Sequence, residues 1–142
     1  MRMRGKKAIF SRRDVWSLDC TLSSIIVEGL RKFKEVISEV DSVAGCPSSL
    51  VEDGEDVEDG IKKWHEILDK MIYAFTNDEP ETPENLFSME TFPAEGSGLI
   101  EFKLHVNNQR VYDEYKAKEK EHERRVTEGL ELFSKYYQSL WY

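Results

Sequence analysis

Cysteine, histidine and proline are scarce in this chain, and long apolar runs are missing. Of its 142 residues, two are Cys, three are His and four are Pro. Cys20 and Cys46 lie in unlike sequence contexts, so they predict no disulfide framework and favour a reducing compartment, the cytoplasm. No apolar stretch approaches the ~20 residues of a membrane-spanning helix, and no apolar segment typical of a secretory signal follows the first residues. The sequence therefore favours a folded protein with a single domain, residues 1–142.

Familiar signatures of catalysis are also missing. The chain has no Gly-x-Ser-x-Gly nucleophile elbow, no phosphate-binding P-loop and no Gly-x-Gly-x-x-Gly fingerprint. His65 and Asp69 have a spacing that suits a metal ion, but no third ligand follows at a recognisable distance. The acidic run at 51–60 departs from the register of a calcium-binding EF-hand. We therefore expect no enzyme activity, no resident metal and no cofactor.

Acidic residues are absent from the first thirteen positions, although the formal net charge of the chain is −8. That overall charge disfavours broad binding to a nucleic-acid backbone, which needs an extended positive surface. The segregated positive charge predicts either a solvated basic arm at residues 1–9 or a local site for an anion. The basic residues of this segment are Arg2, Arg4, Lys6, Lys7, Arg12 and Arg13.

Three segments have the apolar period of an α-helix. In the first, steps of three and four residues form one stripe over 15–40, with Ser11 as the N-cap. Gly29 inside this stripe costs roughly 1 kcal/mol relative to Ala, so we expect a closely packed backbone or a bend there. The second segment covers 61–75 and the third runs from 108 to the C-terminus. The sequence thus predicts a mainly α protein with three long amphipathic helices, whose wide stripes favour an oligomer.

The connections contain one strand signal. Apolar and polar residues alternate over 100–106, which is typical of a β-strand. A single strand is not stable alone, and its partner is one of three candidates: residues 7–10, residues 86–92, or the same strand of a second subunit. The acidic segment 51–60 is expected to be a loop, and 76–98 a long connection. The predicted β element is therefore a short strand or hairpin.

The residue types near the basic segment suit a nucleotide, which combines phosphates with flat bases. Arginine binds phosphate through charge-assisted, often bidentate hydrogen bonds, and an aromatic ring that stacks on a base contributes ~1–3 kcal/mol. Trp16 and Tyr136 each fall one position off an apolar stripe, so we expect both to offer a ring face. Ser11 would add a hydrogen-bond donor at a helix start and Lys135 a second cation. The predicted ligand-binding residues are Ser11, Arg12, Arg13, Trp16, Lys135 and Tyr136.

Five ordered blocks of sequence span most of the chain. They begin at Phe10-Ser11, Phe33-Lys34, Gly45-x-Pro47, Trp64-x-x-Ile67 and Glu128-Gly129. The series resembles a widespread family of small bacteriophage proteins, which we identify as the anti-CBASS sponge family.

This resemblance implies a homo-oligomer, specifically a tetramer, in the host bacterial cytoplasm. It also implies that the chain sequesters cyclic dinucleotides, such as cyclic GMP–AMP, without cleaving them. The nearly two-fold symmetry of such a ligand suits a site shared across a subunit interface. Residues 78–110 depart from the family pattern and resemble an insertion.

Two other functions stay open from the sequence. A phage protein with 28 acidic residues could bind a host protein, either as an inhibitor or as an acidic mimic of DNA. The charged stretch 114–125 and the acidic run would then matter, and the basic arm would not. A minor component of the virion is the third hypothesis.

Overall fold

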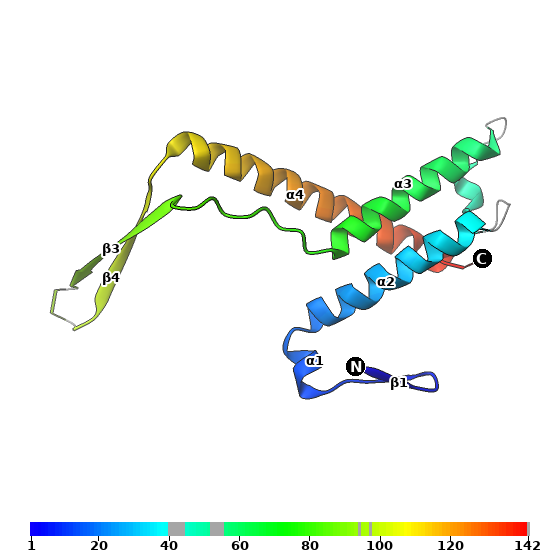
Figure 1. Cartoon of the computed structure of the whole chain (residues 1–142), viewed down its shortest axis with the longest axis horizontal. Coiled ribbons are helices and arrows are strands. Elements are labelled where there is room, and N and C mark those ends of the chain that lie inside the picture. Colours follow the sequence, from blue (N-terminus) through cyan, green and yellow to red (C-terminus); the bar gives the residue numbers. More distant parts are fainter. Residues whose placement is uncertain (40–44, 52–55, 94, 97, 142) are drawn as a thin grey trace. The chain divides into compact units, whose positions relative to one another are not determined.

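The computed structural model describes residues 1–39, 45–51, 56–93, 95–96 and 98–141. Over these ranges the chain is mainly helical, with two small antiparallel sheets (Figure 1). The chain divides into two compact units, which are described separately: one combines residues 1–78 with 125–142, and the other covers 79–124. The predicted mainly α fold with a small β element is confirmed, whereas the single domain stays a prediction.

The first predicted helix is in fact two helices. Helix α1 covers Arg12–Trp16 and helix α2 covers Leu18–Glu39. Ser17 separates them with φ −125° and ψ 69°, outside the helical region. The hydroxyl of Thr21 donates to the carbonyl oxygen of Asp14 at 2.9 Å and so satisfies a backbone acceptor beside the break. The apolar period continues through the break, which is why the pattern alone predicted one helix.

Helix α3 begins earlier than predicted. It covers Val57–Phe75, and its N-cap is Asp56, whose side chain accepts a hydrogen bond from the backbone N–H of Glu58. Glu58 and Asp59 lie in the first turn, where the helix dipole favours negative charge. The end of the predicted acidic loop is therefore helical, while its residues 52–55 lie outside the described ranges.

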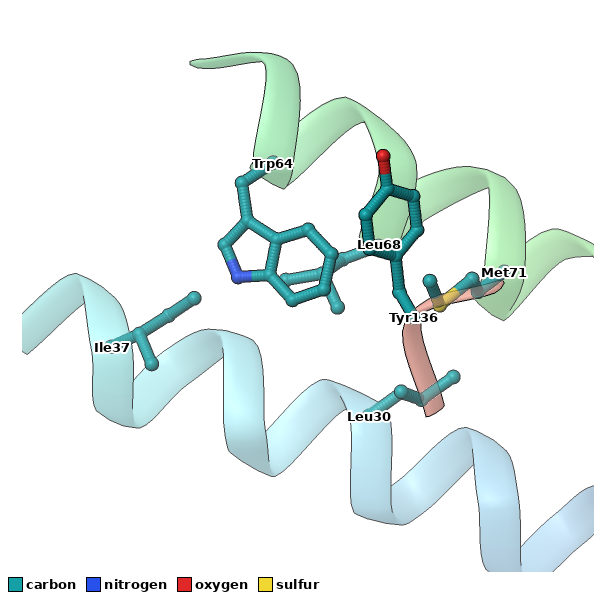
Figure 2. Packing of buried hydrophobic residues seen from close by; sticks show 6 residues of the cluster. All are labelled: Leu30, Ile37, Trp64, Leu68, Met71 and Tyr136. Carbon is teal, nitrogen blue, oxygen red and sulfur yellow. The ribbon is translucent and has the colours of Figure 1, made fainter. Parts of the chain in front are cut away.

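The main hydrophobic core lies where α2, α3 and the end of α4, which covers Gln109–Tyr136, meet (Figure 2). Trp64 is buried, with its ring edge-on to Phe33 at 6.4 Å and to Tyr136 at 5.4 Å between centroids. Burying one such large apolar side chain contributes about 1.5–3 kcal/mol, so these rings fix how α2 and α3 pack. The most buried members are Leu30, Ile37, Trp64, Leu68, Met71 and Tyr136.

Helices α3 and α4 cross closely at Gly129. A Cβ atom there would lie 2.3 Å from the carbonyl oxygen of Lys70 and 2.6 Å from the Cβ atom of Ala74. The Lys70–Glu128 ion pair and the Arg125 guanidinium, 3.5 Å from the Tyr73 ring centroid, flank the crossing. Gly129 is therefore required because no side chain fits between the two backbones.

The basic arm contains a β-hairpin. Strand β1, Arg2–Arg4, pairs with strand β2, Lys7–Ile9, in antiparallel register. Gly5 has φ +61°, a left-handed conformation that glycine adopts readily in tight turns. The four cations of residues 1–9 are thus carried on an ordered ribbon.

The second unit contains the predicted strand. Strand β4 covers Ile100–Val106 and pairs with β3, Phe87–Pro93, in antiparallel register. Of the three candidate partners, residues 86–92 were therefore the right one, and much of the predicted connection 76–98 is a strand instead. Asn107 closes the base of this hairpin, because its side chain donates to the carbonyl oxygen of Asn85 at 2.8 Å and its backbone N–H to that of Leu86 at 2.9 Å.

Candidate functional site

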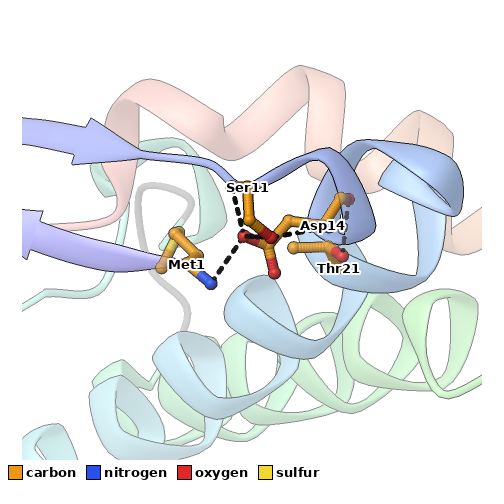
Figure 3. A network of polar contacts seen from close by, with 4 residues as sticks. All are labelled: Met1, Ser11, Asp14 and Thr21. Carbon is orange, nitrogen blue, oxygen red and sulfur yellow. Dashed lines mark hydrogen bonds and ion pairs between the residues drawn. The ribbon is translucent and has the colours of Figure 1, made fainter.

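Asp14 joins the basic hairpin to α1 (Figure 3). Its Oδ2 atom accepts from the backbone N–H of Ser11 at 2.7 Å and from the Ser11 hydroxyl at 2.8 Å. The same oxygen lies 2.9 Å from the terminal ammonium of Met1, the first residue before β1. The pKa of Asp14 is lowered to about 2. The largest cause is the hydrogen bond from the terminal ammonium, and the two hydrogen bonds from Ser11 come next. One carboxylate therefore holds the strand end and the helix start together.

Ser11 has a structural role as the N-cap of α1. Its hydroxyl oxygen accepts from the backbone N–H of Asp14 at 3.3 Å, which completes a capping box. Both Ser11 donors are directed at the Asp14 carboxylate, so the position expected to hold an anion is already occupied by one. We therefore leave Ser11 out of the ligand-binding set.

Arg12, Arg13 and Trp16 form an exposed surface on α1. All three side chains are exposed, and Trp16 is 90% accessible to solvent. The two arginines precede Trp16 by four and three residues, spacings at which helix side chains are neighbours. Helical spacing thus places the two arginines and Trp16 on neighbouring exposed positions of α1. We call these three residues the α1 surface.

The expectation that Tyr136 offers a ring face to a ligand is wrong. Tyr136 is only 6% exposed and packs against Trp64 in the core. Gly129, Leu132, Phe133 and Tyr136 follow one another at steps of three and four residues along α4, and this is the face that packs into the core, so Tyr136 lies inside it. The next residue, Tyr137, is 63% exposed. Lys135 is exposed with its Nζ 5.0 Å from the Tyr136 ring centroid, so its described contact is with that ring and not with α1.

The histidines do not form metal sites with the partners that the sequence offered. Asp69 pairs with Lys34 at 2.5 Å, and burial together with the Lys34 charge lowers the pKa of His65. His105 contacts Glu90 across the β3–β4 hairpin at 3.0 Å. Within the described ranges, no three His, Cys, Asp or Glu side chains are grouped so that they could hold a metal ion.

Two surface hollows in the first unit were not foreseen. One, of about 330 Å³, is apolar and lies between α2 and the end of α4. The other, of about 370 Å³, contains Cys46, whose thiol pKa is raised by burial. Each hollow combines residues that are far apart in the chain, so sequence periodicity gave no signal for it. The apolar hollow is lined by Ile26, Gly29, Leu30, Phe33, Phe133, Tyr137 and Leu140, and the second by Gly45, Cys46, Pro47, Ser48, Ser49, Ser139 and Trp141.

Comparisons with protein-family models, with curated proteins and with solved structures find no match. The resemblance to phage sponge proteins therefore stays a prediction, and a function must be argued from the chain's own side chains. Among the described helices, none is both long and apolar enough to cross a membrane.

Proposed function

We propose that this protein is a bacteriophage immune-evasion protein that binds and sequesters cyclic dinucleotides, such as cyclic GMP–AMP, without cleaving them. The proposal includes a homo-oligomer, a tetramer, that acts in the host bacterial cytoplasm. The observation that carries it is the α1 surface, where an indole that is 90% exposed follows two exposed arginines at helical spacings of four and three residues. The family resemblance supplies the ligand class.

The α1 surface matches the chemistry of such a ligand. Each guanidinium of Arg12 and Arg13 can bind one phosphate through two parallel hydrogen bonds. The Trp16 indole can stack on a base, a contact worth ~1–3 kcal/mol. The hairpin held by Asp14 adds cations close to the start of α1, which raises the local concentration of an anion.

Isothermal titration calorimetry with cyclic GMP–AMP, cyclic di-GMP and a cyclic trinucleotide tests the proposal. We expect at least one of them to bind, and Trp16→Ala and the double variant Arg12→Ala/Arg13→Ala each to weaken binding about tenfold or more, since tenfold corresponds to ~1.4 kcal/mol. Arg31→Ala is the matched control, because Arg31 is an exposed arginine on α2 that pairs with Glu28. If none of the three nucleotides gives a heat of binding, the proposal is overturned.

The fate of the ligand separates a sponge from an enzyme. After incubation and denaturation of the complex, mass spectrometry should recover the cyclic nucleotide intact. A linear product would show hydrolysis and contradict sequestration.

Deleting residues 1–9 separates the proposal from the host-protein alternative. The deletion removes the four hairpin cations and the Met1–Asp14 contact, so it should cripple nucleotide capture. A host-protein inhibitor that relies on the acidic segments would keep its activity.

A further inference from the structure

We infer that α2 is a self-association surface, on which the α2 helix of a second copy packs antiparallel about a two-fold axis at Gly29. This inference stands on the exposed face of α2 and does not depend on nucleotide binding.

Helix α2 has a second apolar face besides the one in the core. With 3.6 residues per turn, positions 18, 22, 25, 29, 32 and 36 fall on one line along the helix, and all of them are apolar or glycine except Lys32, which pairs with Glu35 at 2.7 Å. Leu18, Leu22 and Ile25 on this line are each about 40% exposed, and the line passes into the apolar hollow at Gly29 and Phe33. We call this line the outer stripe. Apolar residues at helical spacing on an exposed face are typical of an interface.

Gly29 lies near the middle of α2 and of the outer stripe. A Cβ atom built on Gly29 would meet nothing within 4 Å in the described part of the chain. Of the two alternatives expected from the sequence, a close backbone neighbour or a bend, the neighbour is therefore not supplied within the described part of one copy, although the helix tolerates glycine there at a cost. A helix from a second copy could approach the α2 backbone closely at Gly29, just as α3 approaches the α4 backbone closely at Gly129.

A two-fold axis at Gly29 gives a self-complementary register. It places Leu22 opposite the second copy's Val36 position and Ile25 opposite its Phe33 position, so apolar residues oppose apolar residues on both sides of the axis. Such an isologous contact closes after two copies. A parallel arrangement would instead put each residue opposite itself.

Charge favours the antiparallel direction over the parallel one. The thirteen residues that begin the chain carry six cations and no acid, whereas the N-cap and first turn of α3 carry three acids, Asp56, Glu58 and Asp59. The Met1–Asp14 and Thr21–Asp14 contacts tie the basic segment to the start of α2. Helix α3 packs antiparallel to α2, as the Lys34–Asp69 pair shows, so its acidic first turn lies toward the far end. Antiparallel copies place opposite charges together, and parallel copies would place like charges together.

Sedimentation velocity of the full chain, from 1 to about 100 µM, tests the interface. We expect the wild type to associate and Ile25→Glu to raise the dissociation constant at least tenfold, because a charge would be buried between two helices. Ser24→Glu is the matched control, since Ser24 is exposed and one position away from the stripe. Circular dichroism should show equal helicity in the three proteins. A wild type that is monomeric at 100 µM, or equal association by Ile25→Glu, would overturn the inference.

Disulfide trapping then tests the two-fold axis. In a background with Cys20→Ser and Cys46→Ala, Gly29→Cys should form a covalent dimer on mild oxidation, because its two copies would lie within disulfide reach. Leu22→Cys should not, because the antiparallel register separates its two copies by most of the helix. Rapid trapping of Leu22→Cys would show parallel packing and contradict the proposed register. A trapped dimer that binds no nucleotide would support the interface and would overturn the sponge proposal alone, so the two proposals can fail separately.

Discussion

The Asp14 carboxylate holds Met1 and the start of α1 together, and titration of the protein with acid should reveal this role. Its pKa is about 2 in the folded chain, against an ordinary 3.8. Since the folded pKa is depressed, the stabilisation is complete above about pH 4 and is lost as the pH falls toward 2. We expect the protection factor of the Ser11 amide, which is the exchange rate of an unstructured peptide at the same pH divided by that of the amide itself, to fall over this window when it is measured by NMR.

Asp14→Asn should remove this transition and leave the Ser11 amide with a low protection factor at every pH. The matched control is Asp19→Asn, which changes an exposed carboxyl in the first turn of α2 and should keep the transition. A protected Ser11 amide at pH 2 in the wild type would contradict the assigned role of Asp14.

Gly129 and Gly29 are both inside helices, yet alanine should affect them in opposite directions. At Gly129 the added methyl would meet the Lys70 backbone and Ala74, so we expect Gly129→Ala to destabilise the fold by about 1–3 kcal/mol. At Gly29 the methyl meets open space, so Gly29→Ala should stabilise a single copy by up to ~1 kcal/mol. Urea unfolding at low micromolar concentration, followed by tryptophan fluorescence, measures both. Equal effects of the two substitutions would contradict the close α3–α4 crossing.

At the scale of elements, periodicity predicted which segments are helical but not where the chain turns. The apolar spacing identified α2, α3 and the second half of α4, and alternation identified β4. The break at Ser17 depends on backbone geometry, which leaves no periodic signal. A helical step of three or of four residues from Phe133 leads to Tyr136 or to Tyr137, and packing against Trp64 decides that Tyr136 is the buried one. The sequence left three candidate partners for β4, because strand pairing is a tertiary contact that the local pattern does not specify. Of the candidate site, Arg12, Arg13 and Trp16 were predictable as neighbours because five consecutive residues of one helix contain them.

At the scale of the whole molecule, the main core draws its most buried residues from the first unit. We therefore expect replacement of residues 87–106 by Gly-Ser-Gly to leave unfolding of that unit nearly unchanged. The base of the hairpin is already closed by the Asn85–Asn107 hydrogen bond, so a short linker can span it. Trp16, Trp64 and Trp141 all belong to the first unit, so their fluorescence reports its unfolding alone. A large loss of stability would show that the hairpin supports the core.

The length of α2 also bears on the binding stoichiometry, the number of ligands bound per polypeptide. Its 22 residues correspond to about 33 Å, and an antiparallel pair would hold the two Trp16 side chains near opposite ends of that rod. No single cyclic dinucleotide is wide enough to touch both. An α2–α2 dimer should therefore bind one guest per polypeptide at saturation, with each indole loaded independently of the other, and a shared site would require a different interface of the proposed tetramer.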